Sequence, residues 1–196
     1  MDPIYTIDSG SNSRRPAVEE WLHGLDLVSA PVRERIVTAW VSAWASSSHA
    51  ALADMPFSPG TPTYRLMDHV NEVTRAGIDL AKRAAADWGI ALDWDIMMSI
   101  LILHDVDKPL LYTVRDGIAG HSRLFHELPH GVVGAMMLKE IGFPHVVVST
   151  VATHATNAPF HGENAEAHIL HYADLFAADH AFRCMGKTPI YLRHGK

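Results

Sequence analysis

The sequence contains almost no cysteine and no excess of positive charge. Cys184 is the only cysteine in 196 residues, which excludes an internal disulfide framework and a cysteine-based zinc site. The formal net charge is −6 with histidine counted as neutral, so the composition provides no basic surface for nucleic acid or for an anionic membrane. We therefore expect a small-molecule substrate as the partner, and the sequence leaves the oligomeric state open.

Long apolar runs are also missing. The longest apolar stretch, residues 96–103, is interrupted by Ser99 and ends at His104, so it is too short to cross a bilayer. The first fifteen residues are polar and lack the apolar core of a signal peptide. These absences indicate a soluble protein, and we expect it in the cytoplasm.

Histidine, by contrast, is abundant, with 14 residues in the chain. Such an excess indicates either metal ligation or proton handling near neutral pH. Apolar residues make up 48% of the chain and charged residues 19%, a balance typical of globular rather than disordered proteins. A folded domain with histidine-based chemistry is therefore expected.

Proline, glycine and apolar spacing divide the chain into segments. Residues 1–15 form a polar arm that we expect to be flexible. Residues 16–63 contain N-terminal helices and a loop at 54–63 with three prolines and one glycine. Residues 64–182 form the main helical domain, and residues 183–196 form a C-terminal tail. In the N-terminal segment, Trp40 and Trp44 recur at helical spacing; we expect them to pack on the core, with a dimer contact as the alternative.

Helical periodicity dominates the main domain. Residues 64–88 are predicted to form a long amphipathic helix stopped by Gly89. Asp93 can cap the next helix, which runs to about His104 and is apolar on most sides, as expected for a central, buried helix. The connection at 105–128 contains an Arg-Asp-Gly turn signal, so the predicted fold is an all-α bundle with at most a minor hairpin there. Further helices are expected at about 129–141, 144–156 and 163–182.

The central helix ends in an adjacent imidazole and carboxylate, His104 and Asp105. Taking both groups out of water is costly unless they are paired or bind a metal ion. An isolated pair would fit a helix cap and a satisfied core histidine, but more candidate ligands lie on separate predicted helices or at their ends: His69, His130, His154 and Asp174. Helices of a bundle can bring such side chains to one interior point. Together they supply nitrogen and oxygen ligands for two divalent ions with Asp105 free to bridge, which suits iron, manganese, magnesium, cobalt, nickel or zinc and argues against Cu(I).

The order of these residues, His … His-Asp … His … His … Asp, resembles that of the HD-domain superfamily of metal-dependent phosphohydrolases. Residues 104–109 (HDVDKP) resemble the HDxxKP signature of that superfamily, and residues 130–144 resemble its second helix motif. The resemblance covers about residues 64–182, which it identifies as an HD domain with a helical-bundle fold. It implies that one ion is held by His69, His104, Asp105 and Asp174, and the second by Asp105, His130 and His154.

Some positions near the motifs leave alternatives open. His121 and His126 lie close to His130 in sequence, so either is an alternative ligand; we favour His130 because a helical motif follows it directly. His130 precedes Gly131, where the superfamily more often has proline, and this difference should not disturb ligation. Asp107 has two interpretations: a surface residue, or a group near the metals with a role in proton transfer.

The resemblance implies hydrolysis of a phosphate ester or nucleotide-like small molecule at a dinuclear site. Asp105 and Lys108 are the predicted catalytic residues, and Lys108 would also bind the phosphoryl group and offset its charge. Arg115 and Arg123 are candidates to orient the substrate, with solvated loop cations as the alternative. Two other functions remain open: a di-iron oxygenase that cleaves a C–C or C–P bond with O₂ on the same ligand set, and a non-catalytic HD module. In the oxygenase Tyr64 would be a substrate-sensing lid, although packing is the simpler interpretation.

Overall fold

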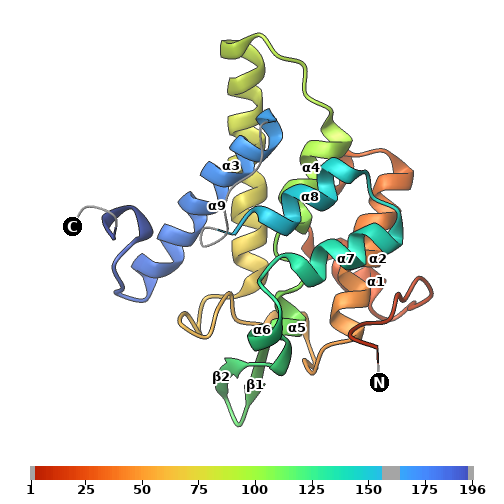
Figure 1. Cartoon of the computed structure of the whole chain (residues 1–196), viewed down its shortest axis with the longest axis vertical. Coiled ribbons are helices and arrows are strands. Elements are labelled where there is room, and N and C mark those ends of the chain that lie inside the picture. The colour runs from red at the N-terminus through yellow and green to blue at the C-terminus, as the bar shows by residue number, and fades with distance from the viewer. Residues whose placement is uncertain (1–2, 156–163, 194–196) are drawn as a thin grey trace.

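The structure, a computed structural model, describes residues 3–155 and 164–193 (Figure 1). It is mainly helical, which confirms the predicted all-α bundle. The longer helices are α1 (Arg15–Trp21), α2 (Ala30–Ala45), α3 (Leu66–Trp88), α4 (Trp94–Leu103), α7 (Val132–Ile141), α8 (His145–Thr153) and α9 (Ala165–Cys184). Shorter elements are α5 (Lys108–Leu111), α6 (Arg123–Glu127), strands β1 (Tyr112–Arg115) and β2 (Ile118–His121), and the 3₁₀ turns η1 (Leu25–Leu27), η2 (Leu52–Asp54) and η3 (Ile190–Leu192). Residues 156 and 163, at which two of the expected helices were to end and begin, lie outside the described residues.

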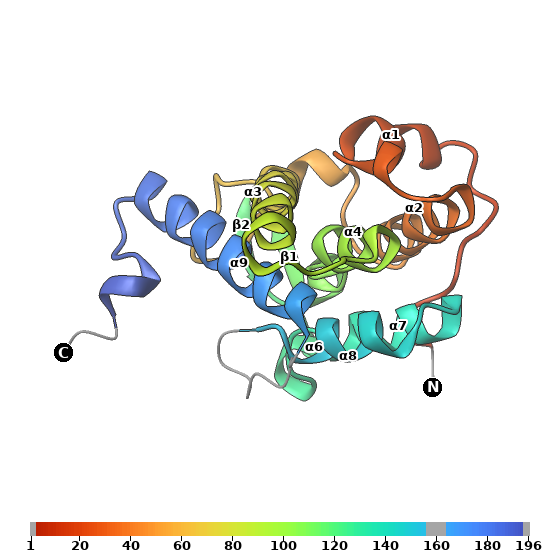
Figure 2. The ribbon, with the colours of Figure 1, turned by 90° about the horizontal axis from the view of Figure 1, so that it is seen from above.

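Helix α4 lies at the centre of the bundle, between α3 and α9 on one side and α2 on the other, with α8 against a further face (Figure 2). Asp93 caps its first turn by accepting hydrogen bonds from the backbone N–H groups of Asp95 and Ile96 at 2.9 and 3.2 Å. Every residue from Met97 to Leu103 is buried, so the prediction of a central helix is confirmed. Among the described residues no helix, α4 included, is both long and apolar enough to cross a bilayer.

The N-terminal helices α1 and α2 pack onto the bundle through tryptophan. Trp40 is fully buried, and its indole N–H donates to the carbonyl oxygen of Ile102 at 3.1 Å. The ring of Trp21 meets that of Trp40 edge to face, with centroids 4.7 Å apart. The expected packing role of Trp40 is therefore confirmed.

The segment before α1 follows helix α2 rather than projecting from the domain. The backbone N–H groups of Thr6 and Asp8 donate to the hydroxyls of Ser46 and Ser42, both at 2.9 Å. The described residues of this arm therefore lie beside α2, and the flexibility of the arm stays a prediction. The division of the chain at residues 64–182 stays a prediction.

The predicted minor hairpin is present between α5 and α6. Strands β1 and β2 pair antiparallel, with Tyr112 opposite His121. Asp116 and Gly117 form the turn with φ angles of 51° and 75°, the left-handed backbone that a two-residue type I′ turn requires. The connection at 105–128 is thus built from α5, the hairpin and α6, at one end of the bundle (Figure 1).

Candidate metal centre

The predicted ligands come together where α3, α4, α8 and α9 approach the start of α7. Helices α3 and α9 run side by side, and α8 packs against α4 and α7 (Figures 1 and 2). The side chains come from α3 (His69), the turn after α4 (His104 and Asp105), the segment before α7 (His130), the end of α8 (His154) and α9 (Asp174). Elements far apart in sequence therefore contribute to one cluster of imidazoles and carboxylates.

The carboxylate of Asp105 lies at the centre of the cluster and faces histidines with both oxygens. Oδ2 is 3.3 Å from Nε2 of His69 and 3.3 Å from Nε2 of His104. Oδ1 is 2.9 Å from Nε2 of His130 and 3.7 Å from Nε2 of His154. Each oxygen therefore belongs to a separate group of potential ligands, which is the arrangement that a carboxylate needs in order to bridge two ions.

Asp174 joins the group around Oδ2 of Asp105. Its Oδ1 is 3.1 Å from Nε2 of His69 and 4.0 Å from Nε2 of His104. The donor atoms of His69, His104 and Asp105 all lie within 4.8 Å of one another, and the same holds for the group around Oδ1. These are nitrogen and oxygen donors of the kind that several divalent transition metals bind.

Two of the histidines are held with one ring nitrogen facing the cluster. His104 and His154 directly follow α4 and α8, where the last carbonyl groups have no partner within the helix. Nδ1 of His104 donates to the carbonyl oxygen of Leu101 at 2.9 Å, and Nδ1 of His154 donates to that of Val151 at 2.7 Å. Because Nδ1 carries the proton in each ring, Nε2 presents a lone pair to the cluster.

Potential ligand atoms are crowded together inside the cluster, as they are around a bound cation. Nε2 of His69 and Nε2 of His104 lie within hydrogen-bond distance of each other at 3.3 Å, and Nδ1 of His69 is buried without a partner. Oδ2 of Asp105 is buried and makes no hydrogen bond of good geometry, although Nζ of Lys108 lies 2.6 Å away. Buried lone pairs and carboxylate oxygens that face one another are costly unless a cation lies among them. The donor set therefore fits divalent metal ions.

The charges of the cluster outweigh the effect of burial on its carboxylates. Burial raises the pKa of Asp105, but the positive charge of Lys108 and the interactions with His104 and His130 hold that pKa well below its usual value. Burial also raises the pKa of Asp174, but the interactions of this carboxylate with His69 and His104 outweigh the effect of burial and lower the pKa below its usual value. Both carboxylates are therefore ionised at neutral pH and available to a cation.

Asp107 is fully buried against His130, so its interpretation as a surface residue is wrong. Oδ1 of Asp107 lies 2.9 Å from Nδ1 of His130, and Oδ2 accepts a hydrogen bond from the backbone N–H of Gly131 at 2.7 Å. Burial lowers the pKa of His130, but the neighbouring carboxylates of Asp107 and Asp105 outweigh it and raise the pKa to about 9. The ring of His130 therefore lies between two carboxylates that favour its protonated, cationic form.

Lys108 and Phe57 lie against the same side of the cluster. Nζ of Lys108 is 3.7 Å from the ring centroid of Phe57, and the Phe57 ring also contacts the imidazole of His69, with centroids 3.9 Å apart and the ring planes tilted by 33°. Phe57 was not among the residues predicted from the sequence. It lies in the proline-containing loop at 54–63, where no periodicity shows which side chains point inward.

A cavity of about 500 Å³ lies beside the cluster, and a volume of this size suits a small molecule. Its polar lining includes Asp105, Lys108, His130, His154, Asp174 and Arg193, and its aromatic lining includes Phe57, Tyr112 and Phe182. Nothing in the sequence pattern identified Phe182, which lies about two turns after Asp174 on α9, or Arg193, which directly follows η3. The ligand cluster is therefore accessible from a pocket with both charged and aromatic walls.

The two predicted substrate arginines do not line this cavity. Arg115 is exposed at the end of β1. Arg123 pairs with Glu127 on α6, and its side chain is 89% exposed. Of the predicted substrate-binding residues, Lys108 is the one whose side chain lines the cavity.

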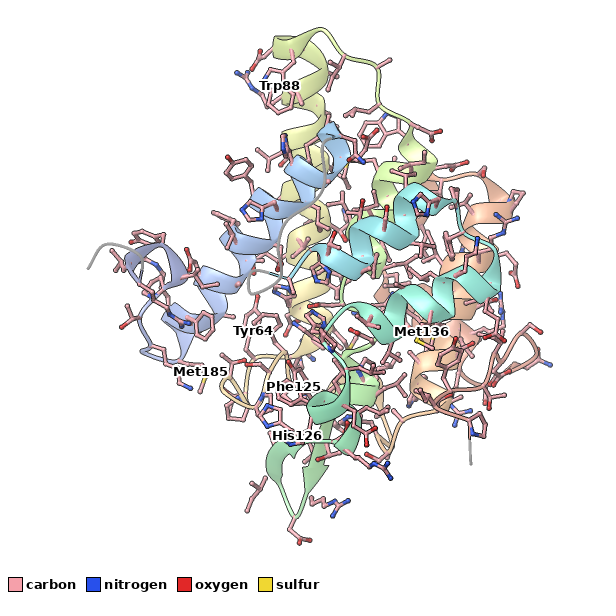
Figure 3. All side chains as sticks on the ribbon, in the orientation of Figure 1. Tyr64, Trp88, Phe125, His126, Met136 and Met185 are labelled. Atoms are coloured by element: carbon pink, nitrogen blue, oxygen red, sulfur yellow. The ribbon has the colours of Figure 1, made fainter. Side chains whose placement is uncertain are left out.

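The alternative ligands His121 and His126 lie on the hairpin and on α6. Both are exposed, and the ring of His121 stacks on Phe125 with centroids 3.9 Å apart. Figure 3 shows Phe125 and His126 together at the hairpin end of the molecule. The geometry therefore favours His130 as the ligand from this part of the chain.

Two comparisons with known proteins found a match to this chain. A curated protein of Methanocaldococcus jannaschii named dihydroneopterin 2′,3′-cyclic phosphate phosphodiesterase is 31% identical over 111 residues, which cover 56% of this chain and 44% of that protein. The chain thus matches less than half of the length of this relative. No solved structure matches the chain. The family model described as HD domain matches residues 67–179, more than half of the chain, and the chain therefore belongs to the HD domain family.

Proposed function

We propose that the protein is a metal-dependent phosphohydrolase that acts on a small phosphate ester through two divalent ions. The observation that carries the proposal is the position of Asp105, whose two carboxylate oxygens face separate groups of histidines at 2.9–3.7 Å. Hydrolysis as the reaction type is supported by the relative, which is named as a cyclic phosphate phosphodiesterase.

The proposed ligands divide between the two oxygens of Asp105. One ion is held by His69, His104, Asp105 and Asp174, and the other by Asp105, His130 and His154. A donor set of nitrogen and oxygen without sulfur suits iron, manganese or other divalent ions, and availability decides among them. When bound, the pair of ions supplies Lewis-acid stabilisation and an activated water nucleophile.

Lys108 supplies a fixed positive charge beside the reacting phosphoryl group. Its side chain is only 7% exposed, and the carboxylate of Asp105 and the face of Phe57 hold its ammonium group in place. A cation held in a site with little water stabilises developing negative charge more strongly than one in bulk water. Lys108 therefore binds phosphoryl oxygens, while Asp105 contacts Lys108 and is a ligand of both ions.

The cavity supports a substrate that carries a flat ring. Phe57, Tyr112 and Phe182 supply aromatic surface on which such a ring can stack. The guanidinium of Arg193 lies 4.2 Å from the ring centroid of Phe182 and adds a positive charge to the lining. We infer a phosphate ester or cyclic phosphate of a ring-bearing small molecule, in line with the cyclic phosphate in the name of the relative. Orientation of this substrate by Arg115 or Arg123 stays a prediction.

Hydrolysis is favoured over the two other functions that the ligand order left open. The name of the relative supports a phosphodiesterase rather than a di-iron oxygenase, and the complete ligand set argues against a non-catalytic module. Tyr64, the lid candidate of the oxygenase, donates its hydroxyl to Glu72 at 2.5 Å and packs against Phe57. These contacts suit a structural role for Tyr64.

The test of the proposal is hydrolysis by protein reconstituted with Fe²⁺, Mn²⁺, Zn²⁺ or Mg²⁺. Substrates are bis(p-nitrophenyl) phosphate, cyclic nucleotides and phosphomonoesters, with oxygen uptake recorded in parallel. We expect metal-dependent hydrolysis that falls more than about a hundredfold in Asp105→Asn. His121→Ala, which alters an exposed histidine outside the cluster, should keep wild-type activity. Oxygen consumption without hydrolysis, or hydrolysis that is unchanged in Asp105→Asn, would contradict the proposal.

A further inference from the structure

His130 differs from its neighbours in the group that holds its ring. His104 and His154 donate from Nδ1 to backbone carbonyls at the ends of helices, at 2.9 and 2.7 Å. His130 lies before α7, directly ahead of its N-cap Gly131. The first turn of a helix offers free N–H groups and no free carbonyl oxygen, so Nδ1 of His130 needs another acceptor.

The carboxylate of Asp107 faces that nitrogen. The side chain of Asp107 is fully buried, with Oδ1 2.9 Å from Nδ1 of His130. The contact is a charge pair without good hydrogen-bond geometry, and neither atom has another hydrogen-bond partner. Oδ2 accepts a hydrogen bond from the backbone N–H of Gly131 at 2.7 Å. One carboxylate thus holds both the ring of His130 and the backbone that follows it.

We propose that Asp107 is a positioning residue that keeps a proton on Nδ1 of His130 and thereby directs the Nε2 lone pair to the second ion. The inference rests on the proposed dinuclear site and adds to it a residue that holds a ligand. Asp107 is not among the residues that line the cavity, so it acts on the reaction through His130. A carboxylate partner also makes His130 a more basic ligand than a histidine held by a neutral carbonyl.

An amide cannot replace this carboxylate, because both groups that face Asp107 are donors. An asparagine has one acceptor oxygen and one donor NH₂ group. If its oxygen accepts from Gly131, its NH₂ faces Nδ1 of His130, which must then give up its proton. The proton moves to Nε2, and the lone pair that should bind the ion is lost. Asp107→Asn is therefore a test of proton placement at almost constant side-chain volume.

The experiment is a Zn²⁺ titration of the apoprotein by isothermal calorimetry, without substrate. We expect wild type to bind two ions, and Asp107→Asn to bind the first ion unchanged and the second about 10- to 100-fold more weakly. Asp116→Asn is the matched control: Asp116 is exposed in the hairpin turn at φ 51°, where asparagine is tolerated, and both affinities should stay at wild-type values.

A double-mutant cycle separates positioning from a general structural role. If Asp107 acts through His130, Asp107→Asn should change metal binding no further in a His130→Ala background. In Zn²⁺-loaded wild type, ¹⁵N NMR should show the proton of His130 on Nδ1. Wild-type affinity for the second ion in Asp107→Asn, an additive loss in the double variant, or equal weakening of both ions would overturn the inference. Since no substrate is used, a failure to hydrolyse phosphate esters would refute the proposed function separately.

Discussion

Gly131 lets α7 begin close enough to α8 for His130 to reach the cluster of candidate metal ligands. Its φ angle is 93°, and a Cβ atom at this position would lie 2.4 Å from the carbonyl oxygen of Val151. That same oxygen accepts the hydrogen bond from Nδ1 of His154. A side chain at residue 131 would therefore disturb both histidines that face Oδ1 of Asp105, and we expect Gly131→Ala to reduce stability and binding of the second ion.

Gly142, at the other end of α7, provides a matched control. Its φ angle is 94°, and a Cβ atom there would meet nothing within 4 Å. An L-residue in the left-handed region costs roughly 1–2 kcal/mol, and alanine recovers about 0.4–1 kcal/mol by restricting the unfolded chain. Gly142→Ala should therefore lower the free energy of unfolding by about 1 kcal/mol. Gly131→Ala adds a backbone collision of roughly 1–3 kcal/mol, giving a total of about 2–4 kcal/mol and a Tm lower by roughly 10 °C.

Urea denaturation followed by circular dichroism measures both free energies of unfolding. The difference between the two variants reports mainly on the collision with Val151, because both glycines have nearly the same φ angle, although their ψ angles are −26° and 31°. Zn²⁺ titration of folded Gly131→Ala then reports on the second ion. Equal destabilisation by the two substitutions, with normal metal binding in Gly131→Ala, would refute the account of how α7 and α8 place the histidines.

Three further outcomes are expected. Lys108→Met should keep both ions but lower kcat about a hundredfold, measured with the best substrate of the hydrolysis panel, because the ammonium beside Asp105 is lost. The neighbours of His130 raise its pKa to about 9, so the ring of the metal-free protein is protonated at pH 7. The affinity for the second ion should therefore rise with pH up to about 9, because the ion displaces this proton. Calorimetry in buffers of different ionisation enthalpy should detect about one proton released per second ion bound. Trp40→Phe should cost about 1–3 kcal/mol in urea denaturation because the buried carbonyl of Ile102 loses its donor.

Part of the cluster of imidazoles and carboxylates was predictable from local patterns, although its role as a metal site stays a prediction. His104 and Asp105 end a helix whose other residues are almost all apolar, so the polar pair stands out in the sequence. Helix periodicity also fixed the central position of α4, and the Asp-Gly turn indicated the hairpin. The start of α7 was placed too early, at 129 instead of Val132, because the left-handed backbone of Gly131 cannot belong to a helix.

The supporting residues were not predictable, because no regular element determines where they point. Asp107 lies in a turn between α4 and α5, where helical periodicity does not apply, and both a buried and an exposed position fit the sequence. Phe57 lies in an irregular loop and reaches His69 only through the tertiary fold. Arg193 comes after the last long helix and reaches the cavity through the turn η3. Charge alone favoured Arg115 and Arg123, although the hairpin and α6 leave both exposed.

The central claim is that Asp105 bridges two ions held by side chains from distant parts of the chain. Anomalous X-ray diffraction from crystals of the Mn²⁺-loaded protein tests it most directly. We predict two anomalous peaks about 3.5–4 Å apart, one beside each carboxylate oxygen of Asp105. A single peak, or peaks that lie away from Asp105, would contradict the account.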